Sequence, residues 1–237
     1  MKRTPSVGEY LIQRLENEGV RHVFGVPGDY VLAFYELMRQ SRLHVVGTCT
    51  EIGAGFAADA YARVNGLGAL CVTYCVGGLN ALNAVAGAYA EKSPLVVISG
   101  APGLDERRRS PLLHHRVRDF NTQRLIFENV TVAAEALEDP DSAPRRIDYA
   151  IEQCKRYKRP VYLEIPRDVV AKPCGPLSMK HVLEPPKSDP DALAEAVAEA
   201  CAMVRSAKRP VILAGVEIHR FGLQRILVDF IEETGLP

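Results

Sequence analysis

The sequence has no net charge and no long hydrophobic run, and these two absences exclude several classes of protein. Its 29 lysine and arginine residues are balanced by 29 aspartate and glutamate residues over 237 positions. A chain without a basic excess is not expected to bind nucleic acid or a membrane surface through electrostatic attraction. No stretch approaches the roughly 20 apolar residues that cross a bilayer. The first residues, Met1–Pro5, also lack the apolar region of a secretory signal.

The sequence also lacks a disulfide framework and the common nucleotide-binding motifs. Its six cysteines are scattered, and several lie in apolar segments, which is typical of buried thiols in a reduced compartment. We therefore expect a cytoplasmic protein. Cys71 and Cys75 are spaced like a metal-binding pair, but no second pair of cysteines or histidines accompanies them. There is no G-x-G-x-x-G motif and no Walker lysine, which argues against dinucleotide-binding and P-loop proteins.

Strands and helices alternate with short connections as far as Pro166. We expect strands at 22–26, 43–48, 69–74, 95–99 and 159–166, and helices at 6–18, 30–40, 51–64, 79–91, 122–127 and 143–157. This alternation predicts an α/β fold with a doubly wound, mostly parallel sheet and helices on both faces. The long polar segment 101–120 interrupts the pattern, and its three arginines, Arg107–Arg109, are expected to form a solvated face.

A change in composition divides the chain into a first domain, residues 1–172, and a short second part. Residues 173–190 contain five prolines and little periodicity, so we expect them to form a linker. A helix at 191–206, a strand at 209–215 and a helix at 223–233 should follow. These elements are too few to bury a core of their own. Residues 191–237 are therefore expected to be the incomplete start of a second α/β domain.

Candidate functional residues follow the strands. Ligands of open parallel sheets bind beyond the carboxyl ends of the strands. The first four strands lead to Pro27–Asp29, Glu51, Thr73–Gly78 and the histidines His114 and His115. Simpler explanations exist for the first three: a helix N-cap, a first-turn carboxylate favoured by the helix dipole, and a glycine turn. Adjacent histidines cannot readily ligate one metal ion, so proton transfer suits this pair better.

In their order and spacing, these residues resemble the N-terminal, pyrimidine-binding domain of thiamine-diphosphate-dependent 2-oxo acid decarboxylases, the pyruvate and indolepyruvate decarboxylase group. The resemblance covers residues 4–172 and is carried by Val26–Asp29, Glu51 with its small-residue helix, Thr73–Gly78 with Asn83 and Gly87, and Leu112–His115. The Glu51 region and Asn83 are features of the broad superfamily. The Gly-Asp and His-His pairs are typical of the decarboxylase branch.

The resemblance implies a role for each of these residues. Glu51 would hydrogen-bond atom N1′ of the aminopyrimidine ring and exchange a proton with it, which a glutamine could not do. Asp29, His114 and His115 would carry the acid–base steps that follow the release of carbon dioxide. The pyrimidine pocket would be shaped by Pro27, Gly28, Thr73, Val76 and Asn83.

The implied cofactors are thiamine diphosphate and Mg²⁺. In this family the metal ligands belong to a C-terminal domain with a Gly-Asp-Gly…Asn motif, which this sequence lacks. The family's active site is shared between the subunits of a homodimer or homotetramer. The chain is therefore expected to supply about half a site, to bind the cofactor weakly by itself and to lack decarboxylase activity.

The substrate implied by the resemblance is a small 2-oxo acid, with pyruvate, indolepyruvate and phenylpyruvate all open. Three other interpretations remain. The chain could belong to an acetolactate synthase-like enzyme or form the pyrimidine-binding subunit of a two-subunit decarboxylase. It could also be a non-catalytic nucleotide-binding module.

Overall fold

The computed structural model describes residues 3–109, 112–175 and 187–237. The chain divides into two compact units, Met1–Val182 and Leu183–Pro237. The described strands of the first unit form one six-stranded sheet in the order β2-β1-β3-β4-β6-β5. They are β1 His22–Gly25, β2 His44–Gly47, β3 Gly68–Val72, β4 Leu95–Ala101, β5 Ala134–Ala136 and β6 Val161–Pro166.

Every neighbouring pair of strands in this sheet is parallel, which confirms the predicted fold class. The sequence did not predict β5, because three residues are too few to show a strand's alternation of apolar and polar side chains. The helices of the first unit are α1 Val7–Asn17, α2 Leu32–Arg39, α3 Glu51–Asn65, α4 Val76–Ala90, α5 Leu104–Arg108, α6 Thr122–Phe127 and α7 Ala143–Tyr157.

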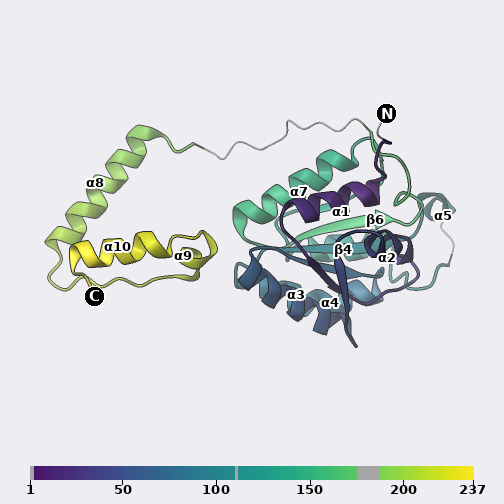
Figure 1. Ribbon diagram of the computed structural model, residues 1–237, viewed down its shortest axis with the longest axis horizontal. Coiled ribbons are helices and arrows are strands. Elements are labelled where there is room, and N and C mark those ends of the chain that lie inside the picture. The colour runs from purple at the N-terminus through teal and green to yellow at the C-terminus, as the bar shows by residue number, and fades with distance from the viewer. Residues whose placement is uncertain (1–2, 110–111, 176–186) are drawn as a thin grey trace. The chain divides into compact units, whose positions relative to one another are not determined.

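Helices cover both faces of the sheet, with α1 and α7 on one side and α3 and α4 on the other (Figure 1). Successive residues of a strand point to opposite faces, so each central strand contributes to two cores. In β3, Cys71 packs in the core that includes α1, α2 and α7, whereas Leu70 packs in the core that includes α3, α4 and α6. All residues of β3 and β4 are buried, as expected for strands covered on both faces.

The second unit contains, in its described residues, the three helices α8 Pro190–Ser206, α9 Val216–Arg220 and α10 Gln224–Thr234. The prediction of a strand at 209–215 was wrong, because these residues form no strand. A strand needs a neighbour to pair with its backbone groups, and the described part of this unit contains none. The amide of Ile212 instead donates to the carbonyl oxygen of Pro237 at 2.8 Å.

Part of the expected linker, residues 176–186, lies outside the described residues. Just before it, Pro173 forms an isolated antiparallel bridge with Ser6, and the amide of Cys174 donates to the carbonyl oxygen of Pro5. These contacts attach residues 173–174 to the first unit, and the predicted domain boundaries stay a prediction. No helix in the described ranges has the length and hydrophobicity of a membrane span.

Candidate active site

The site lies where the order of the strands reverses. From β1 the chain goes to β2 on one side, and β3 then begins the other half of the sheet. Such a reversal leaves a crevice beyond the carboxyl ends of the two strands at the reversal, here β1 and β3. Gly28 follows β1 and Thr73 follows β3, and a methyl group added to Gly28 would lie only 2.6 Å from the Cβ atom of Thr73. The residues predicted after these two strands therefore meet in the crevice.

Glu51 is the first residue of α3, as the sequence predicted for the junction between the second strand and its helix. The hydroxyl of Thr50 accepts a hydrogen bond from the amide of Gly53 at 3.2 Å and caps the helix. The dipole of α3 favours a carboxylate at this end. Glu51 is half-buried, and its Oε2 atom accepts a hydrogen bond of 2.7 Å from Nδ2 of Asn80 on α4.

Helix α4 begins at Val76, three residues before the predicted start at Leu79, so Gly77 and Gly78 form its first turn and not a separate loop. The prediction was wrong because glycine has a low helix propensity. The preceding residue, Cys75, has a backbone φ of 51° and ψ of −84°. A non-glycine residue in such a conformation stores about 1–3 kcal/mol of strain. This turn directs the start of α4 into the crevice.

Gly77, the hydroxyl of Thr73 and the carboxylate of Glu51 make a cradle at the start of α4. A methyl group on Gly77 would lie 2.9 Å from Cγ2 of Thr73 and 3.2 Å from Oε1 of Glu51. The hydroxyl of Thr73 is buried and has no hydrogen-bond partner among the described residues. Because buried polar groups normally have partners, this hydroxyl points to a polar ligand. The carboxylate of Glu51 and this hydroxyl both lie beside Gly77, and together they can hydrogen-bond a heterocycle such as an aminopyrimidine.

The predicted acid–base residues meet on the other side of Gly28. Nε2 of His114 lies 3.3 Å from Oδ2 of Asp29, which immediately follows that glycine. The rings of His114 and His115 meet edge to face, with centroids 4.7 Å apart. His115 has a left-handed backbone, with a φ of 66°, in a turn that brings the adjacent rings together. Its Nδ1 atom is buried without a hydrogen-bond partner in the described part of the chain.

The other predicted pocket residues lie at the edges of this arrangement. Pro27 is exposed, and Val76, at the start of α4, is 51% exposed. Asn83 is exposed on α4, and the amide that contacts Glu51 belongs to Asn80, one helical turn earlier. Sequence reasoning missed Asn80, although residues three apart on a helix share a face. The roles of all these residues stay predictions.

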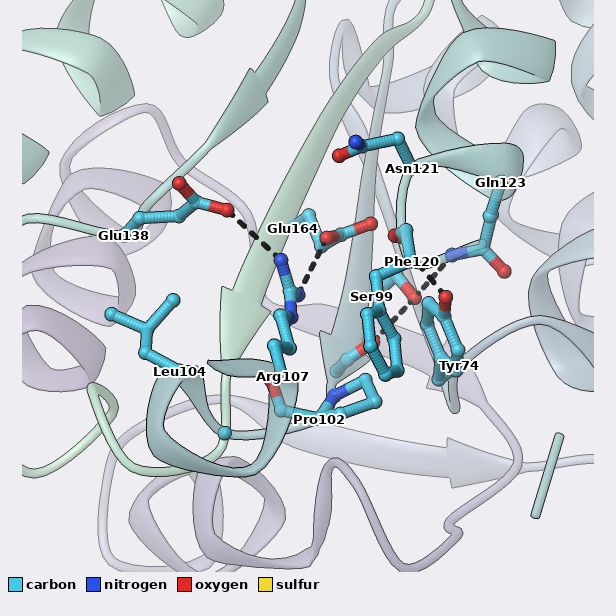
Figure 2. Close-up of polar contacts among 12 residues, drawn as sticks. Tyr74, Ser99, Pro102, Leu104, Arg107, Phe120, Asn121, Gln123, Glu138 and Glu164 are labelled. Carbon is cyan, nitrogen blue, oxygen red and sulfur yellow. Dashed lines mark hydrogen bonds and ion pairs between the residues drawn. The ribbon is translucent and has the colours of Figure 1, made fainter. Parts of the chain in front are cut away.

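Arg107 departs from the expected solvated face, because its side chain is only 11% exposed. It belongs to α5, a short helix within the polar segment 101–120 that interrupts the predicted pattern. Its guanidinium donates to Glu164 at 2.8 Å, to Glu138 at 2.9 Å and to the carbonyl oxygen of Pro102 at 3.0 Å (Figure 2). Helix α5 turns this one arginine towards β6, whereas its neighbours Arg108 and Arg109 are exposed as predicted.

Glu164 is only 2% exposed and belongs to a buried polar network. The hydroxyl of Tyr162 donates to Glu164 at 2.8 Å, and Nε2 of Gln123 donates to Tyr162 at 2.6 Å and to Ser99 at 2.7 Å. Burial raises the pKa of Glu164, and the positive charge of Arg107 opposes that rise. The network therefore holds α5 and α6 against the sheet.

A second contact holds the far end of the segment that carries the histidines. The hydroxyl of Tyr74, which follows β3, donates to the carbonyl oxygen of Phe120 at 3.1 Å (Figure 2). The segment is thus anchored before the histidines by Arg107 and after them by Tyr74. No cluster of three or more histidine, cysteine, aspartate or glutamate side chains in the described ranges could hold a metal ion.

Comparison with known proteins gives one matching family. Residues 5–123 match the family described as "Thiamine pyrophosphate enzyme, N-terminal TPP binding domain". The matched region runs from α1 to the start of α6 and includes every residue of the crevice. It therefore contains the cradle and the histidine pair together.

Similar proteins are named as decarboxylases. The chain is 41% identical to indole-3-pyruvate decarboxylase of Azospirillum brasilense, over 98% of the chain and 42% of the relative. It is 40% identical to pyruvate decarboxylase of Aspergillus parasiticus, over 99% of the chain and 41% of the relative. It is 37% identical to pyruvate decarboxylase 1 of Pisum sativum, over 98% of the chain and 40% of the relative. The chain thus spans about two fifths of the length of these relatives.

Proposed function

Because this chain belongs to the thiamine pyrophosphate enzyme family, as an N-terminal domain of its pyruvate and indolepyruvate decarboxylase group, we propose that it is part of a non-oxidative 2-oxo acid decarboxylase. The complete protein would convert a small 2-oxo acid into an aldehyde and carbon dioxide. It would use thiamine diphosphate, the same compound as thiamine pyrophosphate, together with Mg²⁺. The observation that carries this proposal is that the carboxylate of Glu51 and the unpartnered hydroxyl of Thr73 both lie beside Gly77.

Glu51 is the residue we assign to cofactor activation. When bound, thiamine diphosphate supplies a group that accepts the electrons released with carbon dioxide. Asn80 holds Oε2 of Glu51 by a hydrogen bond of 2.7 Å, which fixes the carboxyl group, while Oε1 lies next to Gly77. From there Glu51 would share a proton with ring nitrogen N1′. The unpartnered hydroxyl of Thr73 would hydrogen-bond the same ring.

Asp29, His114 and His115 are the residues we assign to proton transfer on the substrate side. Gly28 joins the two halves of the site, because it contacts Thr73 and immediately precedes Asp29. Asp29 would hold a proton on Nε2 of His114, which it faces at 3.3 Å. Histidine transfers protons readily near neutral pH, so this pair suits steps in which a carbon or an oxygen atom gains a proton.

We propose that a further subunit completes the site, in a homodimer or homotetramer. Helices α3 and α4 leave Phe56, Val64 and Val76 49%, 84% and 51% exposed, and a further subunit would cover such apolar side chains. The Mg²⁺ ligands would lie outside this chain. Its cysteines are free, including four buried ones, which supports a cytoplasmic location.

The first experiment replaces Glu51 by glutamine in a full-length decarboxylase that contains this chain. Glutamine keeps the size of the side chain and its hydrogen bond with Asn80 but cannot exchange a proton. Turnover should fall about 10²- to 10⁴-fold, the usual contribution of a proton-transfer group. Glu36→Gln, an exposed position on α2, is the matched control and should leave turnover unchanged. Equal turnover of the two variants would refute the assignment.

The second experiment tests whether the chain supplies only part of a cofactor site. Calorimetric titration of the 237-residue chain with thiamine diphosphate and Mg²⁺ should show weak binding, and the chain should not decarboxylate 2-oxo acids. Tight stoichiometric binding would contradict the idea that another subunit completes the site. If the chain alone binds weakly as expected, adding the remaining part of the enzyme should give tight binding of thiamine diphosphate.

A further inference from the structure

The side chain of His114 has a defined orientation towards Asp29. An explanation of this orientation rests on the proposed function, because His114 and Asp29 are the proposed proton-transfer pair. The side chain of His114 is 49% exposed, and the anchors at Arg107 and Tyr74 are several residues away along the chain. A surface imidazole on such a segment would normally sample several rotamers. Something closer must therefore hold its ring towards Asp29.

Tyr30 makes the contacts that can hold it. Its side chain follows Asp29 and is only 1% exposed. The tyrosine ring stacks on the ring of His114, with centroids 4.9 Å apart and an interplanar angle of 20°. Its hydroxyl donates to the carbonyl oxygen of His114 at 3.1 Å and lies 3.4 Å from Nδ1 of the same residue. Tyr30 thus contacts both the ring and the backbone of His114.

These contacts leave a place for a proton on each nitrogen of the imidazole. A proton on Nε2 faces the carboxylate of Asp29 at 3.3 Å. A proton on Nδ1 faces the oxygen of Tyr30, which is free to accept because its own hydrogen points to the carbonyl oxygen. Burial raises the pKa of Tyr30, so the phenol keeps its proton and remains a donor. A charged His114 therefore leaves neither N–H group without a partner.

Tyr30 is itself held from several sides. A methyl group on Gly100, in β4, would lie 2.2 Å from the carbonyl oxygen of Tyr30, so the backbones are in close contact. The ring of Tyr74 meets the ring of Tyr30 edge to face at 5.7 Å. The guanidinium of Arg167 lies 5.3 Å from the centroid of the Tyr30 ring, and Glu106 pairs with that arginine. The tyrosine is therefore fixed before any substrate binds.

We propose that Tyr30 is a positioning residue that orients the His114 imidazole, with Nε2 towards Asp29 and Nδ1 towards its own hydroxyl oxygen. The stack sets the plane of the ring, and the hydrogen bond to the carbonyl oxygen sets the backbone of the turn. His115 lies further from Tyr30, with ring centroids 6.2 Å apart, so its orientation depends less on this residue.

Two variants separate the stack from the hydrogen bond. Tyr30→Phe keeps the aromatic ring and removes the hydroxyl, whereas Tyr30→Leu removes both. Tyr10→Phe is the matched control, because its hydroxyl also makes a partly buried hydrogen bond, to Asp148 at 2.8 Å, between α1 and α7. The readout is the set of histidine ring resonances of the 237-residue chain in ¹H–¹³C and ¹H–¹⁵N NMR spectra. The signals of His114 are assigned by its replacement with glutamine.

The ring protons of His114 should resonate upfield in the unmodified chain, because they lie over an aromatic ring. Tyr30→Phe should keep this shift and change the ¹⁵N signal of Nδ1, whereas Tyr30→Leu should move the ring protons towards the values of a free histidine. Tyr10→Phe should change neither. His114 resonances that do not respond to Tyr30→Phe and Tyr30→Leu would overturn the proposal. If Tyr30→Leu does not fold, an unchanged Nδ1 signal in Tyr30→Phe overturns it alone.

Kinetics of the full-length enzyme give the second readout. Tyr30→Phe should lower kcat about 2- to 10-fold, the usual effect of losing one neutral hydrogen bond, and leave KM unchanged. A change confined to KM would also count against the positioning role. The NMR result does not depend on any decarboxylase activity. Failure of Glu51→Gln to affect turnover would therefore refute the proposed function and leave the proposed orientation of His114 intact. Unchanged His114 resonances in the Tyr30 variants would refute the positioning role and leave the proposed function intact.

Discussion

Breaking the buried ion pair between Arg107 and Glu164 should strongly destabilise the first unit. Replacing Arg107 by methionine keeps most of the side-chain volume but leaves Glu164, which is 2% exposed, with Tyr162 as its remaining side-chain hydrogen-bond partner among the described residues. Breaking a buried pair by removing one partner costs about 3–5 kcal/mol, because a buried charge is left uncompensated. The lost contact with Glu138 adds little, since that side chain is 49% exposed.

The loss should depend on pH. Burial raises the pKa of Glu164 in the folded protein above its ordinary value of 4.5, so between the two values the folded form binds more protons than the unfolded form. Stability is then full below the ordinary pKa and falls as the pH rises through the raised one. Removal of the positive charge of Arg107 raises the pKa of Glu164 further, so the range of pH in which stability falls extends to higher pH. The difference in stability between the Arg107→Met variant and the parent chain should therefore be larger at pH 8 than at pH 5.

Urea unfolding followed by near-ultraviolet circular dichroism measures this effect. The chain has no tryptophan, and its nine tyrosines all lie within Met1–Val182, so the tyrosine signal reports on the first unit. The matched control is Arg108→Met, the same substitution on the same helix at an exposed position, which should cost at most about 1 kcal/mol. Equal midpoints for Arg107→Met and Arg108→Met would refute the reasoning.

A double variant tests the cause of the loss. Adding Glu164→Leu to Arg107→Met removes the buried charge, so most of the stability should return even though the pair is gone. The remaining deficit should be about 1 kcal/mol, because the hydroxyl of Tyr162 then loses its acceptor. A double variant no more stable than Arg107→Met would show that packing, and not charge, accounts for the effect.

Two further predictions concern the helices that face the crevice. In Gly78→Ala the new methyl group would lie 2.2 Å from Oε1 of the buried Gln123, so stability should fall by about 1–3 kcal/mol in the same urea assay. Gly87→Ala, on the same helix with no atom within 4 Å, should instead gain about 0.5–1 kcal/mol, and a similar loss for both would contradict the clash. Thr50→Ala removes the cap that accepts from Gly53 and should cost about 1 kcal/mol, while Thr50→Ser should restore it. Equal stability of the Thr50→Ala and Thr50→Ser variants would show that the cap contributes nothing.

Periodicity predicted the fold where side chains of one element share a clear pattern. The bounds of α6 and α7 were predicted as they stand, since an amphipathic pattern marks α7 and a proline marks its first turn. The start of α4 was missed because its first turn consists of Val76 and two glycines, whose propensity argues against a helix. Tertiary contacts with Thr73 and Gln123 outweigh that propensity. The same kind of override explains β5, which forms only because β6 offers a partner.

The location of the site could be predicted because topology alone brings the carboxyl ends of β1 and β3 together. The partners of its residues could not. Arg107 contacts Glu164 across 57 positions, and Tyr30 contacts His114 across 84. Nothing in the local sequence distinguishes Arg107 from its two arginine neighbours, since only the turn of α5 selects it. Such pairs depend on how separate elements pack, which a single sequence does not reveal.

The cradle at the start of α4 limits how this sequence can change over time. Replacing Thr73 by serine would remove the methyl group that an alanine at position 77 meets at 2.9 Å, but Oε1 of Glu51 would still lie 3.2 Å from that alanine. The same replacement leaves the Cβ atom of residue 73 only 2.6 Å from a methyl group at position 28. Gly28 therefore has no single compensating partner at position 73. Among descendants of this chain, positions 28 and 77 should therefore both stay glycine.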